Sequence, residues 1–193
     1  ILGGPARVGK TTIANMLAKY AFEAGLRPKI MSFAGVLKEE AKKEGYDKEE
    51  NPEEYRIYCQ KNGSEKRAKD KDYWIKKFDA KVKEVAIEEA QLIQEDNNFW
   101  QTVIIIDDCR YMNEVAYGRK HNAIVVFVSP GNRRLPDHNA SWRMHETENL
   151  SNMIMSGHKD YQDIFPWLLR NDRGIKTLEK KLQAVRNVWC GLE

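Results

Sequence analysis

The sequence contains few cysteines and no long apolar segment. Three cysteines are present, widely spaced and odd in number, and none belongs to a CxxC pair. A disulfide framework and a zinc cluster are therefore not expected, and no histidines have metal-ligand spacing. The longest apolar runs, residues 103–106 and 123–128, are far shorter than the roughly 20 residues that span a bilayer. These absences argue against a membrane-spanning or disulfide-rich protein.

The start of the chain also lacks familiar features. No secretory signal pattern precedes the first glycines, and Ile1 stands where an initiating Met would be. The first strand is cut short at this point, so we expect a few residues to be missing before Ile1. With free cysteines and no membrane segment, we expect a cytoplasmic protein that acts as a monomer or a homodimer.

Charged residues are abundant, but neither sign dominates. The 193 residues include 32 Lys and Arg against 29 Asp and Glu, with a net charge of +3 and a mean hydropathy of −0.69. A general nucleic-acid binder normally carries a clear basic surplus, so no nucleic-acid partner is expected. The length fits one domain over residues 1–193 with a single main core.

One segment differs from the rest in composition. Residues 38–89 hold 14 basic and 15 acidic side chains, and their apolar residues recur at helical spacing. Residues 51–54 have the cap, the proline and the acids of a helix start. Gly63 is expected to interrupt that helix, and a long helix with Trp74 on its apolar stripe follows. We expect a solvated helical insert over residues 38–98.

Outside the insert, short β-branched runs alternate with helical patterns. Continuous apolar runs of this kind indicate strands buried on both faces of a parallel sheet. The alternation predicts a doubly wound α/β fold with five parallel strands and helices on both faces. The expected strands are the opening residues, 29–33, 103–106, 123–128 and 164–169, and the expected helices are 12–24, 113–121 and a closing helix over 175–188.

The strongest local pattern lies at residues 4–11. Gly-Pro-Ala-Arg-Val-Gly-Lys-Thr matches the GxxxxGK[ST] motif of P-loop proteins, between a strand and a helix as the motif requires. Backbone N–H groups of such a loop and of the next helix surround a β-phosphate. Lys10 would neutralise phosphate oxygens, and Thr11 would place its hydroxyl on Mg²⁺. The other candidate nucleotide-binding residues here are Gly4, Arg7, Val8, Gly9 and Thr12.

A nucleotide-binding loop does not by itself identify a reaction, because kinases, switches and motors share it. The sequence lacks the NKxD motif that reads guanine, which disfavours a GTPase switch. It also lacks the LSGGQ motif of another class of ATPase. The residues alone therefore favour a phosphotransferase that uses ATP and Mg²⁺.

Acidic and basic residues follow the strand expected at 103–106. Asp107, Asp108 and Arg110 would lie at its carboxyl end, where open α/β sheets bind their ligands. Either acid can hold Mg²⁺, and Arg110 can bind a phosphate through its planar guanidinium. The alternative is that the acids cap the next helix while Arg110 forms a surface ion pair.

Residues 130–148 are rich in turn formers and are expected to be too polar for packed structure. They contain Arg133, Arg134 and Arg143. We expect a mobile lid whose arginines approach the phosphates only after substrates bind, with Arg134 and Arg143 as catalytic candidates. The alternative is an ordinary exposed loop with scattered arginines.

Taken in order, several segments resemble phage-type deoxynucleoside monophosphate kinases. They are the loop at 4–11, SFAGVLKE at 32–39, GSEKR at 63–67 through Tyr73-Trp74, DCR with Asn113-Glu114 at 108–114, and HETE at 145–148. The resemblance covers nearly the whole chain. It implies the nucleoside-monophosphate-kinase form of the P-loop fold, with a helical acceptor insert and a lid. The implied activity is Mg²⁺-dependent phosphoryl transfer from ATP to a (deoxy)nucleoside monophosphate, in the host cytoplasm if a phage encodes the chain.

The resemblance also implies roles for individual residues. Asn171 and Asp172 match the loop that lies against the donor base in such kinases. The resemblance assigns support of the metal to Asp108. Thr11 departs from the pattern, because many relatives carry Asp after the loop lysine, and Asp107 beside Asp108 leaves the metal-side acid open. The residues implied for the acceptor are Lys38, Arg67, Arg110 and Glu114. Trp74 is a further acceptor candidate because its ring could stack on a base, although core packing explains it equally well.

Two alternatives remain open. Animal-type phosphomevalonate kinases resemble the chain over the same segments, and the residues alone do not choose between a nucleotide and a phosphomevalonate acceptor. A nucleic-acid-stimulated ATPase built on the same loop is an alternative of another class. The lack of a basic stripe disfavours that second alternative.

Overall fold

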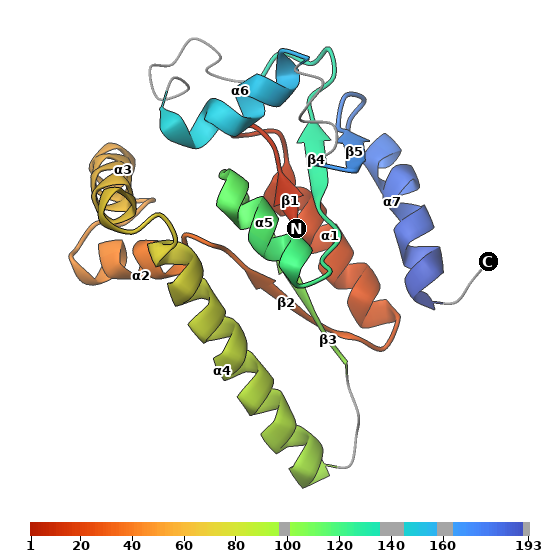
Figure 1. The fold of residues 1–193 in the computed structure, drawn as a ribbon. Helices are drawn as coiled ribbons and strands as arrows, with labels where there is room; N and C mark the ends of the chain where they lie inside the picture. Colours follow the sequence, from red (N-terminus) through yellow and green to blue (C-terminus); the bar gives the residue numbers. More distant parts are fainter. Residues whose placement is uncertain (97–100, 136–144, 158–163, 191–193) are drawn as a thin grey trace. The chain divides into compact units, whose positions relative to one another are not determined.

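The computed structural model describes residues 1–96, 101–135, 145–157 and 164–190. The chain divides into two compact units (Figure 1). The sheet unit comprises Ile1–Met31 and Phe99–Glu193, and the helical unit comprises Ser32–Asn98. Within the described ranges, no helix has both the length and the apolar character needed to cross a membrane.

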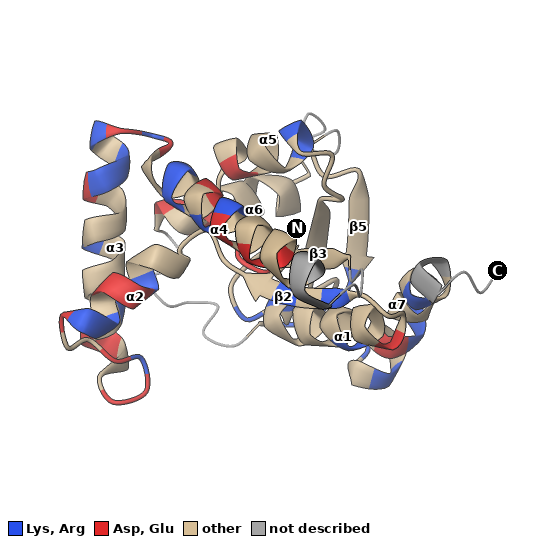
Figure 2. Cartoon of the chain, turned by 90° about the horizontal axis from the view of Figure 1, so that it is seen from below, with Lys and Arg blue, Asp and Glu red and all other residues tan. Residues whose placement is uncertain are grey.

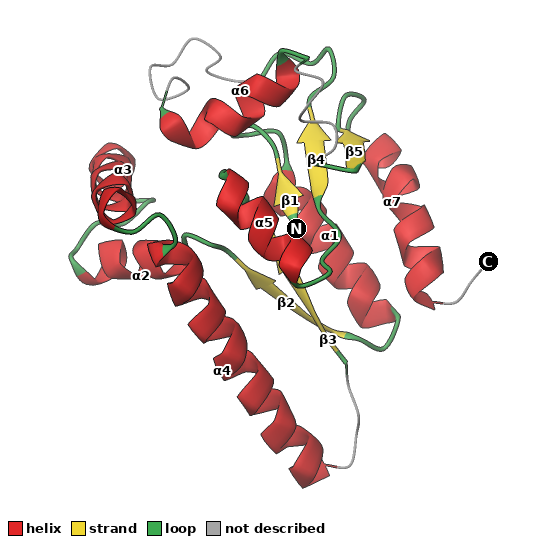
Figure 3. Ribbon diagram, viewed as in Figure 1, coloured by secondary structure: helices red, strands yellow, loops and turns green. Residues whose placement is uncertain are grey.

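The sheet unit is α/β, and all of its strand pairs are parallel (Figure 3). One sheet has three strands in the order β1-β4-β5, and the other pairs β2 with β3. A single bridge joins Gly3 of β1 to Cys109, just after β3. The strands are β1 (Leu2–Gly3), β2 (Arg27–Met31), β3 (Thr102–Ile106), β4 (Val126–Ser129) and β5 (Trp167–Arg170).

The continuous five-stranded sheet expected from the sequence is not present in the described residues. Within the residues that the structure describes, the three-stranded and two-stranded sheets meet only at the Gly3–Cys109 bridge, where Cys109 N donates to Leu2 O at 3.2 Å. β1 pairs in register with β4, Leu2 with Val126 and Gly3 with Phe127, whereas its pairing toward β3 is with Cys109, which lies beyond the end of that strand. The bridge nevertheless places the carboxyl end of β3 beside the end of β1.

Burial on both faces, expected for the strands at 103–106 and 123–128, is found only in part. In β3 only Ile105 and Ile106 are buried, and β5 is largely exposed, including Trp167 and Leu168. β5 is an edge strand with β4 as its one partner in the sheet, so less of its surface is covered. An apolar run therefore predicted the strand correctly but not the burial of its residues.

Helices cover both faces of the sheets. In Figures 1 and 2, α1 and α7 lie on one face and α5 lies on the other. The helices of this unit are α1 (Lys10–Glu23), α5 (Met112–Lys120), α6 (Asn149–Met155) and α7 (Ile175–Cys190), with a 3-10 turn η2 (Glu146–Glu148) before α6. The main core cluster contains Leu2, Val8, Ile13, Ala14, Tyr20, Ile105, Val128, Leu135, Leu178 and Leu182. The loop after β1 is thus anchored in the core through Val8.

The helical unit consists of α2 (Gly35–Lys43), α3 (Pro52–Lys69) and α4 (Tyr73–Asp96). Figure 2 shows Lys and Arg interspersed with Asp and Glu along these helices, as the composition predicts. Their core includes Phe33 and Phe78, whose ring centroids are 4.6 Å apart, and the buried Trp74. The balanced charge of this segment therefore belongs to the solvated sides of three packed helices.

Gly63 does not interrupt the helix, contrary to expectation. α3 runs through it from Pro52 to Lys69, and Gly63 is buried. A Cβ here would come within 3.3 Å of both Leu37 Cδ2 and Arg67 Nη1, so the missing side chain permits close packing. Its carbonyl also accepts a hydrogen bond from Trp74 Nε1 at 3.2 Å. Tertiary contacts thus offset the cost of about 1 kcal/mol that glycine brings to a helix.

Candidate active site

The segment from Gly4 to Gly9 forms a loop between β1 and α1. Gly4 and Gly9 have φ values of 133° and 103°, and Arg7 has a φ of 61°, so the backbone turns through conformations that favour glycine. Gly9 occupies the N-cap position of α1, and among the described residues no side chain caps that end of the helix. The first N–H groups of α1 can therefore donate hydrogen bonds to an anion. The helix dipole also favours a negative charge at this end.

Lys10 is the first residue of α1, and its side chain is buried at this loop. Nζ donates to Gly4 O at 2.7 Å and to Pro5 O at 2.9 Å, and the residue is 7% exposed. Burial, with a smaller contribution from Arg110, lowers the pKa of Lys10 from its ordinary 10.5 to about 8. The ammonium is therefore charged at neutral pH and held against the loop backbone.

Thr11 meets an acid from the end of β3. Thr11 Oγ1 donates to Asp107 Oδ2 at 2.7 Å, although the two residues are 96 positions apart. The neighbouring Asp108 is buried at 8% exposure, whereas Thr11 is exposed. The sequence left open which acid accompanies the loop, and the geometry selects Asp107 as the partner of Thr11.

Two oxygen atoms at this point suit a magnesium ion. The described residues contain no cluster of three or more His, Cys, Asp or Glu side chains that could hold a metal. Mg²⁺, however, usually keeps several waters and takes one or two protein oxygens together with substrate phosphates. The hydroxyl of Thr11 and the carboxylate of Asp107 fit that limited role for an ion that arrives with a nucleotide.

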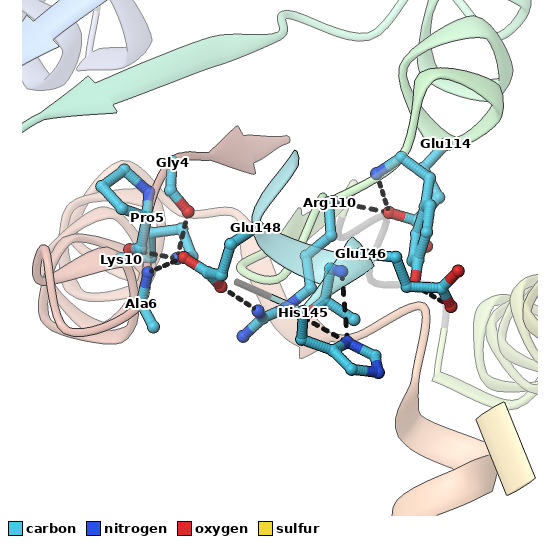
Figure 4. Close-up of polar contacts among 11 residues, drawn as sticks. Gly4, Pro5, Ala6, Lys10, Arg110, Glu114, His145, Glu146 and Glu148 are labelled. Atoms are coloured by element: carbon cyan, nitrogen blue, oxygen red, sulfur yellow. Dashed lines mark hydrogen bonds and ion pairs between the residues drawn. The ribbon is translucent and has the colours of Figure 1, made fainter. Parts of the chain in front are cut away.

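Arg110 lies beside the loop in an ion pair with Glu148 (Figure 4). Its Nη1 donates to Glu148 Oε1 at 2.6 Å, and Glu148 Oε2 accepts from the backbone N–H of Ala6 at 3.0 Å. Glu114 Oε2 accepts from the backbone N–H of Arg110 at 2.6 Å and of Tyr111 at 3.0 Å. Glu114 thereby completes a capping box at the start of α5. A strand end, a helix start and the 145–148 turn therefore converge on the loop.

The described ends of the expected lid are packed, contrary to expectation. Leu135 belongs to the core cluster, Pro130 is fully buried, and Glu148 is 2% exposed. Apolar packing holds the first end, and the ion pair of Glu148 holds the second. The average polarity of residues 130–148 therefore did not predict the burial of their ends. Arg134 is exposed, and Arg143 lies outside the described residues. A catalytic role for either arginine stays a prediction.

Two side chains fix the orientation of one peptide in the loop. Val8 O accepts from Asn171 Nδ2 at 2.8 Å and from Arg133 Nη2 at 3.1 Å. A trans peptide points its C=O and the following N–H in opposite directions, so the Gly9 N–H points away from both donors. Asn171, expected near a nucleotide base, thus contacts the loop itself.

Asp172, Arg7 and Thr12 are also expected from the sequence to bind the nucleotide. Asp172 accepts from Lys181 Nζ at 3.3 Å, and this hydrogen bond lowers the pKa of the Asp172 carboxyl. Arg7 and Thr12 are exposed, the first in the loop and the second in the first turn of α1. A contact of Asp172 with a base therefore stays a prediction from the resemblance.

The acceptor candidates Lys38, Arg67 and Trp74 belong to the helical unit. Lys38 Nζ donates to Ser32 Oγ at 2.9 Å, and the Arg67 guanidinium lies against Gly63. Trp74 is 3% exposed, and its indole N–H is satisfied by Gly63 O. Its burial favours core packing over stacking on a base, the two readings that the sequence left open.

Two contacts at the loop were not foreseen in the sequence. Glu148 stood in the HETE segment without a role, and Arg133 was one of several arginines in a turn-rich stretch. Both reach the loop from more than 120 positions away, so no local spacing could have revealed them. The burial of an acid in an otherwise polar turn can be identified only from the tertiary contacts.

Comparisons with known proteins do not assign the chain to a family. No protein-family model matches it, and no curated protein matches it. The functional conclusion therefore depends on the loop at residues 4–11 and on the side chains that converge on it.

Proposed function

We propose that the protein is a kinase that transfers the γ-phosphoryl group of ATP to a (deoxy)nucleoside monophosphate. The observation that carries the proposal is the contact of Thr11 with Asp107 at 2.7 Å, beside the buried ammonium of Lys10. A hydroxyl, a strand-end carboxylate and a lysine at a glycine loop are the groups that P-loop enzymes use for a triphosphate and its metal. The sequence motif alone supplied the first and the last of these.

The donor side of the proposed site divides into three tasks. The first N–H groups of α1 and the Gly9 N–H would bind phosphate oxygens, because they carry partial positive charge and no side chain of the described ranges caps the helix. Lys10 would neutralise the β- and γ-phosphate oxygens. Thr11 and Asp107 would hold Mg²⁺, which would add positive charge at the same phosphates when bound.

The transfer itself needs no covalent enzyme intermediate. Phosphoryl transfer is accelerated mainly by positioning and by charge stabilisation, so fixed cations are the main requirement. Arg110 supplies one such cation near the loop, with its side chain 32% exposed. The resemblance adds Lys38 and Arg67 as groups for the acceptor phosphate, and it alone supports the choice of a nucleotide acceptor.

A panel of acceptors tests the proposal directly. ADP release is measured by a coupled assay with ATP, Mg²⁺ and each of the common deoxynucleoside and ribonucleoside monophosphates, with mevalonate 5-phosphate in parallel. We expect turnover with at least one nucleotide and none with mevalonate 5-phosphate. Activity with mevalonate 5-phosphate alone would refute the nucleotide acceptor. Hydrolysis that DNA stimulates without any phosphorylated product would refute the kinase.

Replacing Thr11 with Val should raise the Mg²⁺ concentration needed for half-maximal activity by about 10–100-fold, the cost typical of losing a metal-supporting contact. Val removes the hydroxyl that contacts Asp107 and keeps a similar volume. The matched control is Thr11→Ser, which keeps the hydroxyl and should stay within about threefold of wild type on the same scale. A Mg²⁺ titration at saturating ATP measures both. An equal Mg²⁺ requirement in the two variants would remove Thr11 from the proposed metal site.

A further inference from the structure

Glu148 is a buried acid, and the burial of a carboxylate costs free energy. The residue is 2% exposed, and both of its carboxylate oxygens are engaged, Oε1 by Arg110 Nη1 at 2.6 Å and Oε2 by Ala6 N at 3.0 Å. A buried ion pair seldom stabilises a fold more than apolar side chains of similar volume would. Stability therefore gives little reason for a carboxylate at this position, whereas orientation of its two partners gives a specific one.

The partners of Glu148 belong to the proposed phosphate site. Ala6 is part of the loop between β1 and α1, and Arg110 follows β3. Figure 4 shows the Glu148 carboxylate between the loop residues on one side and the Arg110 guanidinium on the other. One carboxylate thus connects the loop to the cation by two hydrogen bonds, and charge-assisted bonds of this kind are short and directional.

Arg110 is held at both of its ends. Glu114 fixes its backbone N–H at 2.6 Å, and Glu148 fixes its guanidinium. Within the described part of the chain, Glu148 is the side chain to which the guanidinium bonds. Because the Arg110 side chain remains 32% exposed, its other N–H donors can still reach a ligand.

The same carboxylate also acts on Lys10. Burial is the main factor that lowers the pKa of Lys10, and Arg110 lowers it further, whereas Glu148, Asp108 and Asp107 favour the charged ammonium. Glu148 therefore favours the charged Lys10 ammonium and also bonds the Arg110 guanidinium, so it offsets the repulsion between these two cations. Without it, Arg110 would be expected to move away from Lys10.

We propose that Glu148 is a positioning residue, which holds the Arg110 guanidinium against the loop so that Lys10 and Arg110 act on the transferred phosphoryl group together. The inference rests on the proposed kinase function. Glu148 contacts neither substrate in this scheme and acts through Arg110. Its removal should slow the chemical step, which depends on the geometry of the cations, more than it weakens the binding of ATP.

A double-mutant cycle tests this role. The variants are Glu148→Gln, Arg110→Met and the two combined, each assayed for kcat and for the KM of ATP with the best acceptor of the panel. We expect Glu148→Gln to lower kcat by about 10–100-fold with a change in KM of at most about threefold. In the Arg110→Met background, the same substitution should change kcat by at most about threefold, because its partner is already gone. A Glu148→Asp variant, which keeps the charge but shortens the side chain, should recover part of the lost kcat.

The outcomes separate the two proposals. If wild type turns over none of the acceptors, the kinase proposal fails before the cycle begins. If wild type is active and Glu148→Gln lowers kcat equally in both backgrounds, or raises only the KM, the positioning role is wrong. Glu146→Gln is the matched control, since Glu146 lies on the same turn, is exposed and contacts Tyr111 Oη at 3.2 Å; it should retain wild-type kcat.

Folding is monitored by circular dichroism for every variant. If Glu148→Gln does not fold, the combined variant still gives a result, because it removes both members of the ion pair and leaves neither charge without its partner. In that case Arg110→Met and the combined variant should have the same kcat within about threefold. A further large loss in the combined variant would overturn the inference.

Discussion

Lys10→Met is expected to abolish phosphoryl transfer while the chain remains folded. Nζ lies 2.7 Å from Gly4 O and 2.9 Å from Pro5 O, so the ammonium is fixed at the loop proposed to hold the phosphates. Methionine keeps most of the aliphatic volume and removes the charge. We expect kcat to fall by about a thousandfold or more, as on loss of a main charge-stabilising group. The coupled ADP assay at saturating ATP measures this loss, and wild-type turnover would contradict the kinase proposal.

Lys19→Met is the matched control, because Lys19 lies on the same helix with its side chain 73% exposed. This variant should keep wild-type kcat.

The pH dependence of stability is a second measurement on Lys10→Met. It tests whether the variant has lost a buried charge while it remains folded. The pKa of Lys10 is about 8 in the folded chain and 10.5 ordinarily, so between these values the unfolded chain binds more protons at this site. The free energy of unfolding contributed by Lys10 therefore rises with pH across this window. Urea unfolding at pH 7 and pH 10 should show a rise in wild type about 2–3 kcal/mol larger than in Lys10→Met. An equal pH dependence would show that Lys10 is not buried as described.

Gly4→Ala should destabilise the protein by about 4 kcal/mol, a large part of the net stability of a domain this size. Gly4 has a φ of 133°, which an L-residue adopts only at a cost of about 1–3 kcal/mol. The new Cβ would also lie 2.4 Å from Val128 O, which forces the loop away from β4 at a further cost of about 1–3 kcal/mol. Urea denaturation at pH 7 measures the change.

Gly25→Ala separates the two costs. Gly25 also has a positive φ, 76°, but a Cβ there meets nothing within 4 Å. This control should lose about 1 kcal/mol from backbone strain alone. If Gly4→Ala is no more harmful than Gly25→Ala, then Gly4 does not lie against Val128 O. A comparison of the two variants therefore tests the position of the loop and not merely its flexibility.

Local patterns predicted the parts of the fold that depend on neighbouring residues. The motif at 4–11 predicted a loop followed by a helix, and α1 begins at Lys10, two residues before the expected start at residue 12. The helices at 113–121 and 175–188 were found within two residues of their expected ends. Spacing of this kind reflects hydrogen bonds that span only a few residues, so it can be read along the chain.

Predictions failed where distant contacts decide the outcome. Gly63 continues α3 because its bare backbone packs against Leu37 and accepts from Trp74. β3 is buried only at Ile105 and Ile106, although the run at 103–106 is apolar throughout. In the described residues, the expected five-stranded sheet is instead two sheets, and the bridge between them pairs Gly3 with Cys109, two residues far apart in the chain.

The sequence by itself determined the glycine loop, its lysine and its threonine, because these lie within eight consecutive residues and their relation is set by the backbone. Only the tertiary structure decided which acid stands beside Thr11, and that Glu148 connects the loop to Arg110. The reason is physical: a hydrogen bond across 96 or 142 positions depends on how strands and turns pack, and on the cost of burying a carboxylate without a partner. Neither this packing nor this cost can be read directly from the order of residues along the chain.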